Sequence, residues 1–191
     1  MESVFTLPYS EYCVAVHLQD LFKPKDGFSL FVPMSRQEKG VDLLLTKRLA
    51  THSVCMTIQV KASRTYSPKP SKSENDNRLR YYTWFNTFDV PKEADYIFLV
   101  GLYPPEDGRT NKRAASWWSA VILAFSHADM TKFMKGIKTR KGTRDPMFGF
   151  GFDEPTKIFQ TRGDTNRNFM DYSNHLLRNQ VKTIKARFEI K

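Results

Sequence analysis

Gln59 and Lys61 lie at the end of an apolar segment, and their side chains are of types that could take part in catalysis. Residues 54–61 read VCMTIQVK, and their apolar members alternate with polar ones. A period of two is typical of a β-strand with two unlike faces, so Gln59 and Lys61 are predicted to share one face. An ammonium in such a place can orient a water molecule and offset the charge that develops on a phosphate under attack.

An acid is predicted to lie beside this pair. The segment 41–47 (VDLLLTK) is also strand-like, and only RLATHS separates it from the strand above, which is short enough for a hairpin. Pairing across a turn near residues 50 and 51 makes opposed residue numbers sum to about 101–103. Asp42 then lies beside residues 59–61. It is the one acid of GVDLLL, a segment whose other residues are apolar and suited to burial.

A second acid comes from a predicted helix, EYCVAVHLQDLF, which follows a serine N-cap. Glu11, Ala15, Leu18 and Phe22 share one helix face, so Glu11 points toward the surface on which the helix packs. An acid in the first turn also suits the positive end of the helix dipole, and that explanation needs no catalysis. Two carboxylates, an amide and an ammonium converging at a sheet edge would suit Mg²⁺ and phosphodiester hydrolysis.

The layout SEYCVAVHL…GFSLFVP…GVDLLL…MTIQVKAS resembles the PD-(D/E)XK nuclease superfamily, over roughly the first third of the chain. Those enzymes share a helix that bears an acid, then a strand hairpin that carries Asp, then (Asp/Glu/Gln)-x-Lys. The resemblance implies that Asp42 binds metal, that Lys61 is catalytic and that Glu11 is the first-helix acid. It also implies that Gln59 completes or orients the metal shell and that the main-chain carbonyl of Val60 is a further ligand. The implied activity is a restriction-like or repair endodeoxyribonuclease that uses Mg²⁺, with Mn²⁺ as a substitute.

Two positions depart from the superfamily pattern. Val41 precedes Asp42 where the pattern has proline, and Gln59 is neutral where many relatives have a carboxylate. A neutral amide binds Mg²⁺ less strongly, so activity depends on whether Glu11 reaches the site. A non-catalytic nucleic-acid-binding or interaction protein on the same fold is therefore an alternative, as is a nuclease acting on RNA or branched DNA.

The net charge of the chain also indicates what kind of molecule it binds. Lys and Arg number 30 against 20 Asp and Glu, a formal charge of +10, which favours DNA or another anionic partner. The run KFMKGIKTRKGTR at 132–144 contains no acid, and the polar stretch 62–80 is predicted to be a mobile loop. Taken alone, each could be a solvated surface segment. The predicted phosphate contacts are Arg64, Lys69, Lys72, Lys138, Arg140 and Lys141.

A single domain over 1–191 is predicted, of α/β (α+β) class, with a central mixed sheet of about five or six strands flanked by helices. The resemblance narrows this architecture to a restriction endonuclease-like core. Residues 145–159, with two glycines between phenylalanines, are expected to be irregular. A long C-terminal helix is expected within 168–191, with an apolar stripe of Leu177, Val181, Ile184 and Phe188. The remaining expected elements are strands at 28–34, 41–47 and 53–61, strands in YYTWFNTFDV, ADYIFLVGLY and SWWSAVILAFS, and a helix in ADMTKFMKGI.

Cysteine content and hydropathy bear on the compartment. Cys13 and Cys55 cannot form a disulfide framework, and both are expected to be buried cysteines in a reducing compartment. No apolar run approaches the roughly 18 residues of a membrane helix, so a cytoplasmic protein with no membrane partner is expected. Cleavage of both strands of a duplex needs two sites, which predicts a homodimer or a partner subunit if duplex DNA is cut.

Aromatic residues are frequent in the strand segments RYYTWF and SWWSAV. Tyr81, Tyr82, Trp84, Trp117 and Trp118 could stack on unpaired bases. Aromatic residues of strands more often pack in a core, and core packing is the preferred interpretation here.

Overall fold

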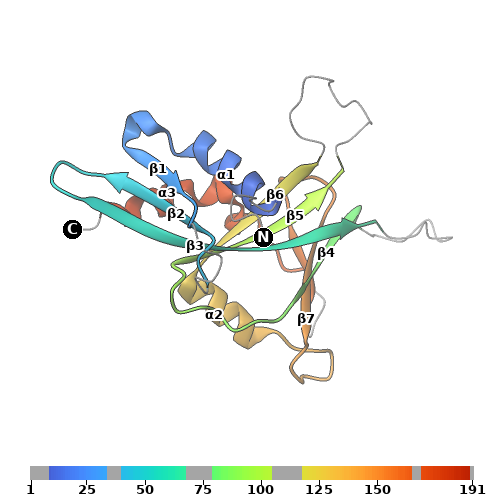
Figure 1. The fold of residues 1–191 in the computed structure, drawn as a ribbon. Coiled ribbons are helices and arrows are strands. Elements are labelled where there is room, and N and C mark those ends of the chain that lie inside the picture. Colours follow the sequence, from blue (N-terminus) through green and yellow to red (C-terminus); the bar gives the residue numbers. More distant parts are fainter. Residues whose placement is uncertain (1–8, 34–39, 68–78, 105–117, 165–168, 190–191) are drawn as a thin grey trace, which may run out of the picture.

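The computed structural model describes residues 9–33, 40–67, 79–104, 118–164 and 169–189. Within these ranges the protein has a mixed α/β architecture, with one eight-stranded sheet and three α-helices (Figure 1). The class is as predicted, whereas eight strands replace the five or six that were expected. The strands are β1 (Phe28–Phe31), β2 (Leu43–Arg48), β3 (Ser53–Tyr66), β4 (Tyr81–Asn86), β5 (Tyr96–Tyr103), β6 (Ser119–Ser126), β7 (Met147–Phe152) and β8 (Phe159–Arg162). The helices are α1 (Tyr9–Leu21), α2 (His127–Gly136) and α3 (Leu177–Arg187), with short 3₁₀ turns at Pro24–Asp26 and Ser173–His175.

β3 is the strand that connects the parts of the sheet, because three other strands pair with it. It pairs with β2 antiparallel and with β5 parallel, which makes the sheet mixed, as predicted. At its far end Thr65 and Tyr66 pair with β4, so β3 continues beyond Lys61. The prediction of a loop from residue 62 is therefore wrong for residues 62–66. Residues 62–64 pair with β5, and Thr65 and Tyr66 pair with β4, so strands distant in sequence satisfy their main chain. Residues 68–78 of the predicted loop lie outside the described residues.

The β2–β3 hairpin has the predicted register. Leu43 lies opposite Ile58, and the pairs that follow keep opposed residue numbers at a sum of 101. The backbone N–H of Leu49 donates to the carbonyl of His52 (2.8 Å) and closes the turn. Leu43 and Ile58 are both fully buried, so burial of the apolar face holds the hairpin in this register.

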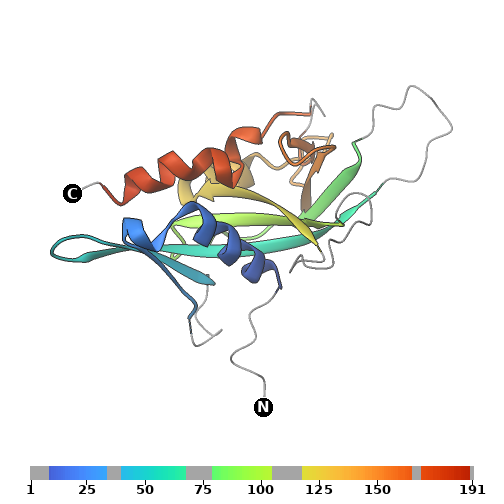
Figure 2. The same cartoon turned by 90° about the horizontal axis from the view of Figure 1, so that it is seen from above.

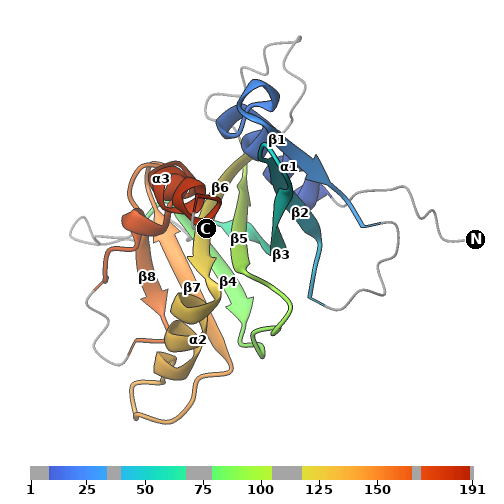
Figure 3. The same ribbon diagram turned by 90° about the vertical axis from the view of Figure 1, so that its left-hand side faces the viewer.

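Two apolar layers lie on opposite faces of β5 and β6. One layer also contains residues of β2 and β3 and packs against α1 and α3, whereas the other packs against α2, β4 and β7. Figure 1 shows α1 and α3 on one side of β3 with α2 on the other, and Figure 2 shows α1 and α3 from above, along the same face. Figure 3 shows β4, β7 and β8 splayed away from β1, β2 and β3. The alternation of side chains along β3 therefore decides which of these layers each residue faces.

The segment 145–159, expected to be irregular, contains β7 and the start of β8. Phe148, Phe150 and Phe152 are buried and alternate with Gly149 and Gly151. This is the pattern of a strand in which one face carries phenylalanines and the other face has glycines in place of side chains. A Cβ at Gly149 would lie 2.5 Å from the carbonyl oxygen of Thr83, and one at Gly151 would lie 2.6 Å from a methyl of Leu79. The glycines therefore allow Thr83 and Leu79 to approach β7 closely, and they do not interrupt the strand.

The C-terminal helix begins at Leu177, later than the pattern suggested, because the 3₁₀ turn at Ser173–His175 precedes it. Its predicted stripe is confirmed, since Leu177, Ile184 and Phe188 are buried and Val181 packs against the same layer. Across the described ranges, no helix has both the length and the apolar character needed to cross a membrane.

Candidate functional site

Asp42 immediately precedes β2 and lies across from Gln59 of β3. Its backbone N–H donates to the carbonyl of Ile58 (2.9 Å), and its Oδ2 accepts a hydrogen bond from the backbone N–H of Val60 (2.7 Å). The predicted neighbourhood of Asp42 and residues 59–61 is therefore confirmed. The bond to Val60 has a structural role, because it satisfies a main-chain donor where the hairpin ladder ends, and it also fixes the carboxylate beside Gln59.

Gln59 is a polar side chain in a buried place. It is 8% exposed, and its Oε1 is buried without a hydrogen-bond partner among the described residues. Leaving a buried acceptor unsatisfied costs about 1–3 kcal/mol, so such atoms usually bind a water, an ion or a ligand. The oxygen of Gln59 is therefore available to a small ligand next to Asp42.

Lys61 is partly exposed, and its ammonium lies over an aromatic ring. The Nζ atom is 5.4 Å from the centre of the Phe88 ring, which is a cation–π contact. Phe88 follows β4 and packs against the apolar layer of α2. This contact orients the ammonium toward the α2 side of β3.

The parallel register with β5 places Gln59 and Lys61 on that same side. Gln59 pairs with Ile97 and Lys61 with Leu99, and both partners belong to the layer that packs against α2. Val60 belongs to the opposite layer, with α1. Gln59 and Lys61 thus share a face as predicted.

Glu11 lies on α1, on the other side of the sheet. Its helix packs through Val14 and Leu18 against the layer that contains Val60, and Glu11 itself is half-buried. Glu11 therefore shares no sheet face with Gln59 and Lys61. Its role as a metal ligand stays a prediction.

The donors beside Asp42 are of a kind that suits a hard cation. Within the described ranges there is no group of three or more His, Cys, Asp or Glu side chains that could hold a metal ion. The predicted set contains only two such residues, Asp42 and Glu11, and relies on Gln59 and the Val60 carbonyl for further oxygens. A carboxylate and an unsatisfied amide oxygen fit Mg²⁺, which keeps several of its waters when bound.

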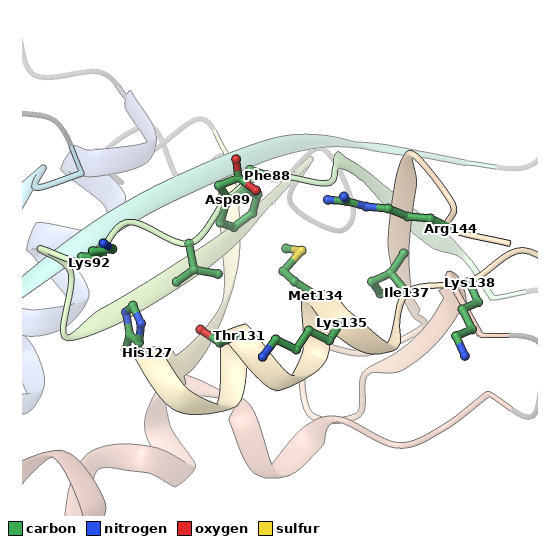
Figure 4. A pocket seen from close by; sticks show the side chains of 11 residues that line it. Phe88, Asp89, Lys92, His127, Thr131, Met134, Lys135, Ile137, Lys138 and Arg144 are labelled. Atoms are coloured by element: carbon green, nitrogen blue, oxygen red, sulfur yellow. The ribbon is translucent and has the colours of Figure 1, made fainter.

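A cavity of about 580 Å³ lies between α2 and the segment 88–92. Figure 4 shows Arg144 extending across it above Met134, while the ammonium of Lys138 points away. The Oγ1 of Thr131, a residue that lines the cavity, is buried without a partner among the described residues. The cationic residues of the lining, against the single acid Asp89, are Lys92, Lys135, Lys138 and Arg144. Phe88 lines the same cavity, so this basic surface begins beside Lys61.

A second cavity, of about 520 Å³, gathers the three predicted phosphate contacts of the segment 132–144. Lys138, Arg140 and Lys141 are exposed there, and Lys138 lines both cavities. Arg64 is exposed but pairs with Leu102, on the α1 side of β3, opposite to Lys61. Lys69 and Lys72 lie outside the described residues.

The expected burial of aromatic and cysteine side chains holds only in part. Tyr81 is buried as expected, whereas Trp84 and Trp118 are 39% and 44% exposed, and Trp117 lies outside the described residues. Cys13 is buried but Cys55 is exposed, on the outward face of β3. Strand alternation places Trp84 on the face opposite to Thr83 and Phe85, but only the burial of those two residues in the structure shows that the face of Trp84 is the outer one.

Comparisons with known proteins give no relative for this chain. No family model matches the sequence. No curated protein matches it, and no solved structure matches the fold. The resemblance to the PD-(D/E)XK superfamily therefore stays a prediction carried by the residues around Asp42 and Lys61.

Proposed function

We propose that the protein is a Mg²⁺-dependent endodeoxyribonuclease of the PD-(D/E)XK kind, restriction-like or repair type, that hydrolyses DNA phosphodiester bonds. The observation that carries this proposal is the meeting of Asp42 with residues 59–61 across the hairpin, through the bond from Asp42 Oδ2 to Val60 N (2.7 Å). An acid, an amide oxygen and an ammonium thus gather at the end of one strand pair. An acid and an amide oxygen can hold a divalent cation, and an ammonium can offset the charge that develops on a phosphate under attack.

The order of elements supports a restriction endonuclease-like core. A helix that bears Glu11 is followed by β1, β2 and β3 in antiparallel order, with Asp42 immediately before β2 and Gln59-x-Lys61 on β3. β5 then lies parallel to β3. This matches the arrangement of helix, hairpin and lysine strand that the resemblance implies.

Each side chain has a distinct role in the proposed reaction. Asp42 and the Oε1 of Gln59 would hold Mg²⁺, with the Val60 carbonyl as a further ligand that the resemblance implies. The resemblance also implies Glu11 as a ligand, but Glu11 lies on the opposite face of the sheet from Gln59. When bound, Mg²⁺ supplies Lewis acidity and lowers the pKa of a coordinated water. The Lys61 ammonium donates hydrogen bonds that orient the attacking water, and its charge offsets the charge that develops on the phosphate oxygens.

The basic cavities support a DNA substrate. Lys92, Lys135 and Arg144 line the cavity that begins beside Lys61, and a backbone of phosphates is the ligand that such cations bind without regard to sequence. One chain offers one such site, so cleavage of both strands of a duplex would involve a homodimer or a partner subunit.

A non-catalytic DNA-binding protein on the same fold is the second candidate. Two observations favour it: Gln59 is neutral, and α1 carries Glu11 on the face opposite to Gln59 and Lys61. Such a protein would use the same basic surface and would leave the phosphodiester bond intact.

Cleavage assays on plasmid and single-stranded DNA in Mg²⁺ or Mn²⁺ test the proposal, with Lys61→Ala beside the wild type. Lys47→Ala is the matched control, because the Nζ of Lys47 lies over the Phe28 ring at the same 5.4 Å, on the α1 side of the sheet. Both variants lose one lysine charge and one cation–π contact from a strand, and Lys47→Ala also loses an ion pair with Glu189 (3.5 Å). Only Lys61→Ala is expected to lose cleavage, by about 100-fold or more, while both still bind DNA. Equal cleavage by the two variants, or a wild type that binds but never cuts, would favour the second candidate.

A further inference from the structure

Trp84 stands on the outer face of β4, away from the apolar core. Its strand neighbours Thr83 and Phe85 are buried, whereas the indole of Trp84 is 39% exposed. The residue opposite it on β7 is Gly149, which has no side chain to cover the ring. A large aromatic surface is thus left open to solvent on a strand.

Arg162 and Asp145 hold this ring in place. The Arg162 guanidinium lies 5.4 Å from the centre of the Trp84 ring, and it donates to both carboxylate oxygens of Asp145 (3.1 and 3.0 Å). Asp145 is 6% exposed and also accepts from the backbone N–H of Met147 (3.0 Å). The hydrogen bond from Arg162 keeps the pKa of Asp145 below its ordinary value, so the pair stays charged. A fixed guanidinium and a fixed indole form a preorganised stacking surface.

Three further cationic residues and one further acid, Asp164, line the cavity beside this surface. The cavity lined by Trp84 and Arg162 also has Lys138, Arg140 and Lys141 in its wall. These three come from a tight hairpin, closed by the bridge between Lys138 and Arg144 and turned at Gly142, whose φ is 79°. Aromatic stacking beside a basic wall is the arrangement by which proteins bind unpaired nucleotides.

The surface is connected to the proposed active site through one hydrogen bond. The backbone N–H of Trp84 donates to the Oγ of Ser63 (3.1 Å), at the point where β4 separates from β3. Ser63 lies two positions after Lys61, on the same face of β3. Because Thr65 lies opposite Thr83, alternation places the Trp84 indole on the other face of this strand pair from Lys61, so a nucleotide at Trp84 would lie near the same strand junction but across the sheet from Lys61.

We propose that Trp84 and the hairpin 138–144 bind an unpaired nucleotide of the DNA substrate, with the base on the indole and phosphates on Lys138, Arg140 and Lys141. This inference rests on the proposed function in that it takes DNA as the ligand. A paired base has both faces covered by its neighbours in the duplex, so stacking on Trp84 requires a base that is free. The preferred substrate is accordingly single-stranded DNA or DNA with an unpaired segment.

Binding assays in EDTA separate this site from catalysis. The probes are a fluorescent thymidine oligonucleotide of about twelve nucleotides and a blunt duplex of equal phosphate number, followed by anisotropy at about 0.1 M salt. Trp84→Ala is expected to weaken single-strand binding about 5- to 150-fold and duplex binding by less than about twofold. Lys141→Ala should weaken both and lower the salt slope by about 0.7–0.9, because it removes a phosphate contact. Trp118→Ala, the loss of an equally exposed tryptophan beside α1, should change neither.

Tryptophan fluorescence gives a second measurement that does not depend on stability. Trp84→Phe keeps a ring for stacking, so it should retain most of the single-strand affinity while the quenching of protein fluorescence by the oligonucleotide is largely lost. Equal weakening of single-strand and duplex binding by Trp84→Ala, or unchanged quenching in Trp84→Phe, would overturn the inference. If the wild type never cuts but these effects are found, only the nuclease proposal fails. If the wild type cuts and Trp84→Ala binds single strands normally, only this inference fails.

Discussion

The carboxylate of Asp42 accepts a hydrogen bond from the backbone N–H of Val60 at 2.7 Å, between the two residues of the Gln59-x-Lys61 motif. This relationship serves two purposes that can be separated. It satisfies a main-chain donor at the end of the β2–β3 ladder, and it places a negative charge beside the buried oxygen of Gln59. The first purpose requires only an oxygen acceptor, whereas the second requires the charge.

Asp42→Asn and Asp42→Ala distinguish these purposes. Asparagine keeps an oxygen that can accept from Val60, so its unfolding free energy should stay within about 0.5 kcal/mol of the wild type. Alanine leaves the Val60 N–H without this acceptor and should cost about 1–3 kcal/mol. Both variants should lose cleavage in Mg²⁺. Urea denaturation and the plasmid assay measure the two effects, and an active Asp42→Asn protein would show that Asp42 only completes the strand pair.

His175 should make stability fall in mild acid. Its ring stacks on Phe125 with centroids 4.1 Å apart, and burial lowers its pKa below 6.5, against weaker opposing effects of the Ala124 backbone and Asp129. Well above pH 6.5 this residue is neutral in both the folded and the unfolded state. Below it the unfolded state takes up a proton first, so the unfolding free energy should drop by up to about 1.4 kcal/mol per pH unit until the folded-state pKa is reached.

Urea denaturation between about pH 7.5 and pH 5 measures this loss. His175→Phe preserves the stacked ring without a titrating group and should show a flatter pH dependence than the wild type. His52→Gln removes an exposed histidine and is the control. Parallel curves for the wild type and His175→Phe would show that another group is responsible.

The hairpin and the position of Asp42 beside residues 59–61 were predictable because both depend on local patterns. Alternation along residues 54–61 and a short connection determine the register. The residues opposite Asp42 can then be found from the constant sum of paired residue numbers. The placement of Glu11 was not predictable in the same way. Helical periodicity shows that Glu11 is on the buried face of α1, but only the packing of α1 on the layer of Val60 determines which side of the sheet that is.

Pairing between distant segments explains the two errors in the sheet. Residues 62–66 lack a clear strand pattern, and they become a strand because β5 pairs with residues 62–64 and β4 pairs with Thr65 and Tyr66. The glycines of β7 suggest a loop in isolation, and they are required because Thr83 and Leu79 approach closely. In both places tertiary contacts outweigh local propensity.

Gln59→Glu should bind a cation more strongly than the wild type does. Without metal, the variant should be less stable than the wild type. A carboxylate at this 8% exposed position would lie next to Asp42, so burial and like charge would both raise its pKa and destabilise the folded state. In EDTA the variant should melt below the wild type. Mg²⁺ should raise its melting temperature more than that of the wild type, and a concentration a hundredfold above Kd corresponds to about 2.7 kcal/mol of stabilisation.

Gln160→Glu provides the matched control for that experiment. Gln160 is 5% exposed on β8, and its Nε2 donates to the carbonyl of Arg162, far in sequence from Asp42. A buried acid should destabilise the protein at both positions, because a lone buried charge is costly wherever it lies. Recovery by Mg²⁺ should occur only for Gln59→Glu, since only that position adds a carboxylate beside Asp42. Recovery of both variants would indicate a general salt effect, and recovery of neither would remove Gln59 from the proposed metal site.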